Sequence, residues 1–193
     1  RYALNLSLLK DKEFFKKNKI CLEIGFGSGE IIFKEAKKNP KNIYIGIEYY
    51  RRGVAQLLKK IDDHDLKNIQ IFHGDAHVFL KEISNFFFDE IWIFFPDPWP
   101  KKRHEKRRFI QIASINRLYE ILKPDGKLYI SSDDKSYISW ILSLIFQSDK
   151  FEWLAESPFD WKNPYREYYG SRYEEKGMKK NRPPYFLKFK KTD

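Results

Sequence analysis

Four short stretches of this sequence carry residues suited to binding a small molecule. The first is Glu23-Ile24-Gly25-Phe26-Gly27-Ser28-Gly29, in which Gly25, Gly27 and Gly29 recur at alternate positions. Glycines let a chain turn sharply from a strand into a helix and let its backbone approach a ligand closely. The spacing differs from the G-x-G-x-x-G that seats a pyrophosphate on a helix N-terminus. The carboxylate of Glu23 favours a cationic amino-acid moiety here, and a glycine-rich turn without a ligand is the structural alternative.

Two further carboxylates follow short apolar runs. Glu48 comes after Gly46-Ile47, where a carboxylate that accepts hydrogen bonds from both hydroxyls of a ribose is expected. This position does not distinguish a nicotinamide dinucleotide from S-adenosylmethionine. Asp75 follows Gly74 and can accept a hydrogen bond from an adenine amino group, or it can be the N-cap of a helix. Both interpretations of Asp75 stay open.

The fourth stretch, FPDPWPKKRHEKRR at residues 95–108, combines a carboxylate, a tryptophan and six lysines and arginines. Its prolines restrict the backbone, so Asp97 is held in a fixed place at low entropic cost. Runs of charge are commonly solvated surface. Because this run lies beside the predicted cofactor pocket, we interpret it as a phosphate-binding segment.

Composition supports a phosphate-bearing partner. The 193 residues include 37 Lys and Arg against 27 Asp and Glu, a net charge of +10. The single cysteine, Cys21, excludes an internal disulfide and a cysteine-based zinc cluster, and the four histidines have no metal-ligand spacing, so we expect no metal. Short apolar runs and the lack of a leader pattern predict a soluble, cytoplasmic protein, and the length predicts one domain over residues 1–193.

Apolar runs rich in β-branched residues alternate with stretches of helical periodicity, which predicts an α/β fold built on a parallel sheet. The expected strands are Ile20–Ile24, Ile43–Ile47, Ile69–Phe72, Glu90–Phe95, Lys127–Ser131 and Phe151–Ala155, with an edge or antiparallel strand at Tyr185–Phe189. Helices are expected between them, one of them ending at a turn through Pro124-Asp125-Gly126, and Pro158–Arg182 is predicted to be an active-site loop. In such sheets ligands bind beyond the carboxyl ends of the strands, where the four stretches lie.

The tract at residues 95–108, together with EIGFGSG and GIE, closely resembles the bacterial tRNA (guanine-N7-)-methyltransferases, a class I S-adenosylmethionine-dependent family. The resemblance covers nearly the whole chain. Ser132-Asp133 resembles the family's Thr-Asp, and residues 171–174 resemble its Thr-x-Tyr/Phe-Glu. Both departures replace Thr by Ser and keep the hydroxyl. Because Asp134 follows directly, the aspartate that matches the family's motif is either Asp133 or Asp134.

The resemblance implies a Rossmann-like class I methyltransferase fold: a mostly parallel twisted sheet, helices on both faces and an antiparallel C-terminal strand. It implies methylation of a guanine N7 in the variable loop of tRNA, with no obligatory protein partner in a monomer or homodimer. It implies that S-adenosylmethionine is contacted by four carboxylates, Glu23, Glu48, Asp75 and Asp97. The residues that it implies around the target guanosine are Lys101, Asp133, Ser171, Arg172, Tyr173 and Glu174.

Guanine N7 carries an available lone pair, so its methylation needs alignment of the two reactants rather than a general base. A carboxylate that faces the Watson–Crick edge of guanine can accept from N1–H and from the amine, and it stabilises the charge that the base acquires. We expect catalysis to depend on Asp97 and Asp133, with Glu174 as a second guanine contact; helix capping by Asp133 and a surface salt bridge of Glu174 are the alternatives.

The same sequence offers groups that could hold the RNA itself. The main candidates for phosphate contacts are Lys101, Lys102, Arg103, Lys106, Arg107 and Arg108, supplemented by Lys179, Lys180 and Arg182. Aromatic side chains could stack on bases or simply close the core: Trp99, Trp161, Tyr165, Tyr168, Tyr169 and Tyr173.

Three other functions share part of this pattern. An NAD(P)-linked oxidoreductase is disfavoured by the glycine spacing. A non-catalytic RNA-binding module is disfavoured by the intact set of carboxylates and glycines. Methylation of a protein or a small molecule is disfavoured by the excess of basic residues.

Overall fold

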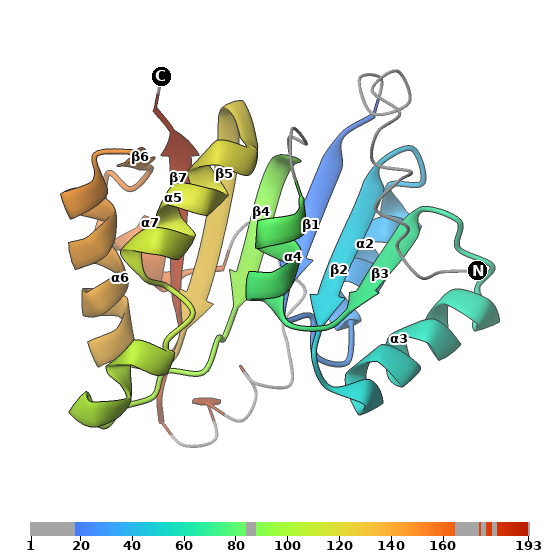
Figure 1. The fold of residues 1–193 in the computed structure, drawn as a ribbon, viewed down its shortest axis with the longest axis horizontal. Coiled ribbons are helices and arrows are strands. Elements are labelled where there is room, and N and C mark those ends of the chain that lie inside the picture. The colour runs from blue at the N-terminus through green and yellow to red at the C-terminus, as the bar shows by residue number, and fades with distance from the viewer. Residues whose placement is uncertain (1–17, 84–87, 165–173, 175–176, 179–180, 193) are drawn as a thin grey trace. The chain divides into compact units, whose positions relative to one another are not determined.

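The computed structural model describes residues 18–83, 88–164, 174, 177–178 and 181–192. The chain divides into two compact units, residues 1–92 and 93–193. Among the described residues, strands are hydrogen-bonded in the order β3-β2-β1-β4-β5-β7-β6 (Figure 1), and β4 (Phe88–Phe94) runs from the first unit into the second. No helix within these ranges is both long enough and apolar enough to cross a membrane.

The first unit is a set of parallel strands. β1 (Ile20–Ile24) pairs with β2 (Ile43–Glu48) on one side and with β4 on the other, and β2 pairs with β3 (Ile69–His73). Every residue of β1 and β2 is buried, because the strands are covered on both faces, which explains their continuous apolar sequence. Since the strands are parallel, Glu23 and Glu48, in the last residues of β1 and β2, and Asp75, just after β3, lie at one edge of the sheet.

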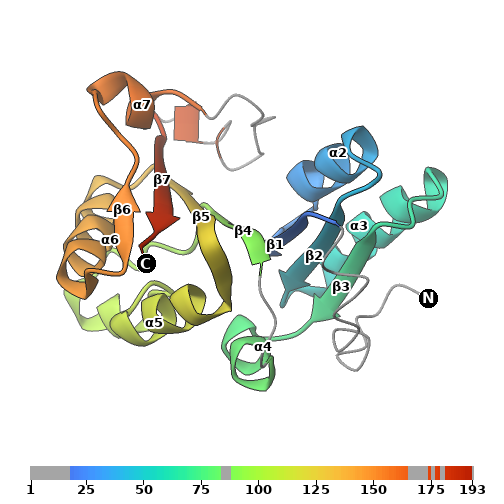
Figure 2. The ribbon, with the colours of Figure 1, turned by 90° about the horizontal axis from the view of Figure 1, so that it is seen from above.

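Three helices cover the strands of this unit. α2 (Glu30–Lys38) and α3 (Arg51–Asp63) pack against β2 and β3 and against each other. α4 (Ala76–Glu82) lies on the opposite face (Figure 2). α2 and α3 present their apolar stripes to the sheet, including Ile32, Ala36, Leu57 and Ile61, which are fully buried.

The second unit contains the antiparallel part of the sheet. It comprises a 3-10 helix η2 (Lys102–Arg107), α5 (Ile112–Ile121), β5 (Leu122–Ser132), α6 (Lys135–Ser148), β6 (Phe151–Trp153), α7 (Pro158–Lys162) and β7 (Tyr185–Lys191). β7 lies between β5 and β6 and is antiparallel to both, with Ser132 opposite Tyr185. Its buried side chains join those of β5 and α6 in the core of this unit.

The predicted fold class is confirmed: the sheet is mostly parallel, has an antiparallel C-terminal strand and carries helices. β7 is an interior strand, and the short β6 forms the edge. β5 begins at Leu122, before the predicted turn, and Asp125 within that turn has a φ angle of 60°. Lys191 donates to the carbonyl of Leu122 at 2.7 Å, and Lys190 pairs with Asp125 at 2.7 Å. The predicted loop at Pro158–Arg182 begins with the helix α7.

Candidate functional site

The backbone of the glycine-rich turn after β1 adopts conformations that residues other than glycine rarely adopt. Gly25 and Gly27 adopt φ angles of 76° and 57°, in the left-handed region. A Cβ built on Gly25 meets no atom of the described residues within 4 Å, so among these residues this side of the turn is open. A Cβ at Gly53 would collide with the carbonyl of Gly27, so α3 needs a glycine where it meets the turn. The turn is therefore tightly packed on one side and open on the other.

Glu23 is buried at the end of β1 without a full set of partners. Its side chain is 3% exposed, and its Oε2 accepts no hydrogen bond from any residue that the structure describes. Burial raises the pKa of this carboxyl from an ordinary value of 4.5 to about 8; a hydrogen bond from the backbone of Ile32 opposes the rise, and the neighbouring carboxylates Glu30 and Glu48 add to it. An incompletely paired buried carboxyl is costly, and a cationic ligand would relieve that cost. The residue fits the amino-acid end of S-adenosylmethionine.

Glu48 fixes the glycine-rich turn. Its Oε2 accepts from the backbone N–H of Gly27 at 2.7 Å, and its Oε1 accepts from the N–H of Tyr50 at 2.8 Å. The side chain is therefore held in one orientation, and each oxygen keeps lone-pair capacity for a further donor. The predicted contact of Glu48 with ribose hydroxyls is compatible with this geometry and stays a prediction.

Lys60 is a residue that the sequence analysis missed. From α3, its Nζ donates to the carbonyl of Ser28 at 2.8 Å and pairs with Glu30 at 3.4 Å. Burial alone would raise the pKa of Glu30, but a hydrogen bond from Ser28 and the charge of Lys60 lower it. Lys60 thus ties α3 to the turn. Its one signal in the sequence is a lysine three residues after the buried Leu57, beside the apolar stripe of an amphipathic helix.

Asp75 caps a helix. Its Oδ1 accepts from the backbone N–H of His77 at 2.7 Å at the start of α4, and its side chain is exposed. The N-cap interpretation is confirmed. The adenine contact is a separate use of the same carboxylate and stays a prediction.

In the second unit, the loop after β4 holds Asp97 between two residues with unusual backbones. Phe95 and Trp99 have φ angles of 50° and 43°, a region that costs free energy for residues other than glycine. The carbonyl of Pro98 accepts a hydrogen bond from Nε of Arg108 at 2.8 Å, so a side chain that follows the loop also holds its backbone in place. Asp97 itself is exposed. The structure therefore presents this carboxylate on a restrained loop.

Arg108 differs from its predicted role as a phosphate ligand. It is 3% exposed, its guanidinium lies over the rings of Tyr137 and Trp140 at 5.3 and 5.0 Å, and it pairs with Glu105 at 3.5 Å. A buried arginine with these contacts cannot reach RNA, so the prediction for Arg108 is corrected: this residue supports the loop. The remaining basic residues of the segment are exposed: Lys101, Lys102, Arg103, Lys106 and Arg107. Arg107 lies 4.9 Å from the ring of Trp99.

The two aspartates after β5 have different partners. Asp134 caps α6, since its Oδ1 accepts from the N–H of Tyr137 at 2.9 Å and from the hydroxyl of Ser136 at 2.6 Å. Asp133 pairs instead with Arg182 at 3.0 Å and is 18% exposed. A Cβ on Gly177 would lie 2.9 Å from Oδ2 of Asp133, so this segment packs directly on the carboxylate. Helix capping therefore belongs to Asp134, and Arg182, predicted to contact phosphate, holds Asp133.

Part of the predicted substrate site is outside the described residues: Ser171, Arg172, Tyr173, Tyr165, Tyr168, Tyr169, Lys179 and Lys180. Glu174 is described and is partly buried. Trp161 is partly exposed and stacks on Tyr185, with ring centroids 5.7 Å apart.

Comparisons with known proteins identify the family. A family model described as a putative methyltransferase matches residues 17–187. A tRNA (guanine-N(7)-)-methyltransferase from Bartonella henselae is 40% identical over 188 residues, which are 96% of this chain and 79% of the relative. One from Agrobacterium fabrum is 39% identical over 170 residues, 88% of this chain and 73% of the relative. The chain belongs to the tRNA (guanine-N(7)-)-methyltransferase family.

Solved structures of other methyltransferases share the fold of this tRNA (guanine-N(7)-)-methyltransferase family member. An rRNA methylase from Streptococcus thermophilus superposes with a TM-score of 0.61 at 14% identity, covering 92% of this chain and 89% of that chain. A putative methyltransferase from Streptococcus mutans in complex with SAH gives a TM-score of 0.56 at 13% identity, covering 91% and 90%. At this identity the likeness supports the fold class alone.

Proposed function

We propose that this chain transfers the methyl group of S-adenosylmethionine to N7 of a guanine in the variable loop of tRNA. Family membership supports the reaction, and the observation that carries the cofactor assignment is the buried, incompletely paired Glu23 beside the open face of Gly25. When bound, S-adenosylmethionine supplies a methyl group on a positively charged sulfur. One family model spans both compact units, which supports a single methyltransferase domain over residues 1–193.

In this proposal the glycine-rich turn and four carboxylates bind the cofactor. Glu23 and the backbone of Gly25, Gly27 and Gly29 hold its amino-acid end. Glu48 accepts hydrogen bonds from the ribose while it fixes the turn through Gly27. Asp75 receives the adenine amino group with lone pairs that the N-cap does not use. Asp97, which lies on a restrained loop of the second unit, is proposed as a further cofactor contact because the family resemblance implies it.

The chain aligns the base rather than activating it. Guanine N7 needs no deprotonation, so the rate comes from holding N7 in line with the methyl group. We assign Asp133 to the N1–H and amino group of the guanine, which selects G over A and offsets the positive charge formed on the base. Arg182 holds the carboxylate in one orientation through an ion pair at 3.0 Å. Lys101, Ser171, Arg172, Tyr173 and Glu174 complete the proposed guanosine site.

Exposed cations hold the tRNA backbone in this proposal. Lys102, Arg103, Lys106 and Arg107 lie on η2, and all four are exposed. Each phosphate that they neutralise releases counterions, so the affinity for tRNA should fall steeply as salt rises.

The two adjacent aspartates provide a matched test. Transfer of a labelled methyl group to an unmodified tRNA transcript is measured for the parent chain, Asp133→Asn and Asp134→Asn. We expect Asp133→Asn to lose turnover while it still binds S-adenosylmethionine. Asp134→Asn should stay active, because asparagine is an equally good N-cap. If the two variants behave in the opposite way, the guanine contact is Asp134; if neither loses activity, this carboxylate pair does not read the base.

A further inference from the structure

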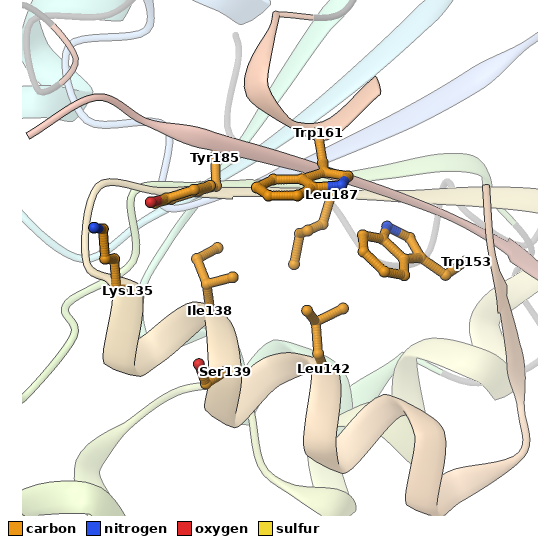
Figure 3. Close-up of a pocket in the computed structure, with 8 residues that line it drawn as sticks. All are labelled: Lys135, Ile138, Ser139, Leu142, Trp153, Trp161, Tyr185 and Leu187. Atoms are coloured by element: carbon orange, nitrogen blue, oxygen red, sulfur yellow. The ribbon is translucent and has the colours of Figure 1, made fainter. Parts of the chain in front are cut away.

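The second unit contains a pocket that none of the proposed cofactor or guanine contacts uses. It has a volume of about 240 Å³ and lies between α6, β6, β7 and α7 (Figure 3). Ile138 and Leu142 of α6 form its floor in this view, and the rings of Trp161 and Tyr185 lie above them. The ring of Trp153 points in from one side. The lining is almost wholly apolar and aromatic, and the size suits a flat ring system.

Two features of the aromatic residues indicate the kind of ligand. Trp161 and Tyr185 are stacked at 26° with ring centroids 5.7 Å apart, and both side chains are partly exposed. They offer a flat surface on which another ring can stack. The ring of Trp153 also lines the pocket, so it adds apolar aromatic surface. The pocket therefore favours a ligand with a flat, apolar face.

Cations border the pocket. Lys135 lines it and is exposed, and Nζ of Lys162 lies 5.2 Å from the ring centroid of Trp161. A lipid chain or an apolar peptide side chain would not use the lysines. A nucleotide uses both the aromatic surface and the lysines, because its base has a π-face and its backbone carries phosphate.

The pocket also adjoins the proposed guanine contact. Tyr185, in its lining, pairs in register with Ser132, the residue before Asp133. Lys135 follows Asp133 by two residues, so their Cα atoms are at most about 8 Å apart. A nucleotide in the pocket can therefore belong to the same RNA segment as a guanine held by Asp133.

We propose that this pocket binds a second nucleobase of the tRNA, next to the target guanine along the strand, by stacking it against Trp161 and Tyr185. This inference rests on the proposed function. A base bound in this pocket would give the protein a second contact with the tRNA loop that carries the target guanine. That contact would orient the guanine although it does not touch the guanine itself.

The test measures tRNA binding and methyl transfer separately. Trp161→Ala is compared with Phe159→Ala, which removes a 71% exposed aromatic ring from the same short helix outside the pocket. Both proteins and the parent are titrated with an unmodified tRNA transcript and with transcripts made abasic at single positions on either side of the target. Stacking contributes about 1–3 kcal/mol per base, so Trp161→Ala should weaken tRNA binding about 5- to 150-fold, with unchanged affinity for S-adenosylmethionine.

A transcript that is abasic at one of these positions should bind the parent more weakly, by the same factor as Trp161→Ala weakens binding of the intact transcript. The affinity of Trp161→Ala for that abasic transcript should be no lower than its affinity for the intact one. The proposal is overturned if no flanking abasic position weakens binding to the parent, a result that needs no variant to fold. It is also overturned if Trp161→Ala and Phe159→Ala bind tRNA with the same affinity. The same holds if the loss of binding caused by the abasic position adds to the loss caused by Trp161→Ala. A parent that methylates tRNA N7 under any of these outcomes keeps the proposed function. A parent that binds no tRNA overturns both.

Discussion

Replacing Glu23 by glutamine should remove a pH-dependent penalty on the stability of the ligand-free protein. Burial raises the pKa of this carboxyl from 4.5 to about 8. Between these values the folded chain keeps a proton that the unfolded chain has released, so the free energy of unfolding falls as pH rises. Glutamine is close in shape to the protonated acid and does not titrate. The free energy of unfolding of Glu23→Gln should therefore not show this fall with rising pH.

The size of the effect follows from the shift. One pKa unit corresponds to about 1.4 kcal/mol, and the slope applies throughout the window between the two pKa values. Raising the pH from about 5.5 to about 7.5 should therefore cost the parent about 3 kcal/mol relative to Glu23→Gln. For a chain of this length, that corresponds to roughly 6–12 °C in the unfolding temperature.

The assay is urea unfolding of the ligand-free parent and of Glu23→Gln at a series of pH values. Glu82→Gln, which neutralises an exposed carboxylate on α4, is the control and should follow the parent. S-adenosylmethionine should bind Glu23→Gln more weakly, because the variant offers no anion to the ligand's ammonium. If the stabilities of the parent and Glu23→Gln stay parallel from pH 5.5 to 7.5, Glu23 is not a desolvated acid held for a cation, and the cofactor assignment loses its main support.

Three further predictions concern residues that position others. Lys60→Met should lower the affinity for S-adenosylmethionine about tenfold, measured by calorimetry, because a charged hydrogen bond to the glycine-rich turn is lost. An unchanged affinity would show that Lys60 does not position the turn for the cofactor. Arg108→Met should lower the free energy of unfolding in urea by about 1.5–3 kcal/mol, because the charged hydrogen bond to the carbonyl of Pro98 is lost, and it should leave the salt dependence of tRNA binding intact. Lys106→Ala should instead reduce that salt slope by about 1 and barely change stability; the reverse pattern would return Arg108 to the set of phosphate contacts. Arg182→Gln should reduce kcat with little change in cofactor affinity, because the carboxylate of Asp133 loses the cation that orients it; a kcat equal to that of the parent would show that Arg182 does not position Asp133.

Local patterns predicted most of the fold. The apolar runs at Ile20–Ile24 and Ile43–Glu48 were readable because both are buried on two faces, and the alternate glycines identified the turn that follows. The start of β5 at Leu122 could not be predicted, because Pro124-Asp125-Gly126 is a local turn signal, whereas the contacts of this segment with Lys190 and Lys191 come from a strand far along the chain.

The same limit applies to the candidate site. Arg108 and its exposed neighbours have the same residue types, and only tertiary packing against Tyr137 and Trp140 separates a buried support from a surface cation. Asp133 and Asp134 are likewise equivalent in sequence, and the beginning of α6 decides which one becomes the cap. Side chains that act on their own turn or helix are predictable locally, whereas long-range partners are not.

The central claim is methylation of guanine N7 in tRNA. The direct measurement is to incubate the chain with labelled S-adenosylmethionine and an unmodified tRNA transcript, then to cleave the RNA with borohydride and aniline at 7-methylguanosine. We expect label in the RNA and cleavage at one guanine of the variable loop. Label without that cleavage would contradict N7 as the acceptor, and bound S-adenosylmethionine without label in the RNA would contradict tRNA as the substrate.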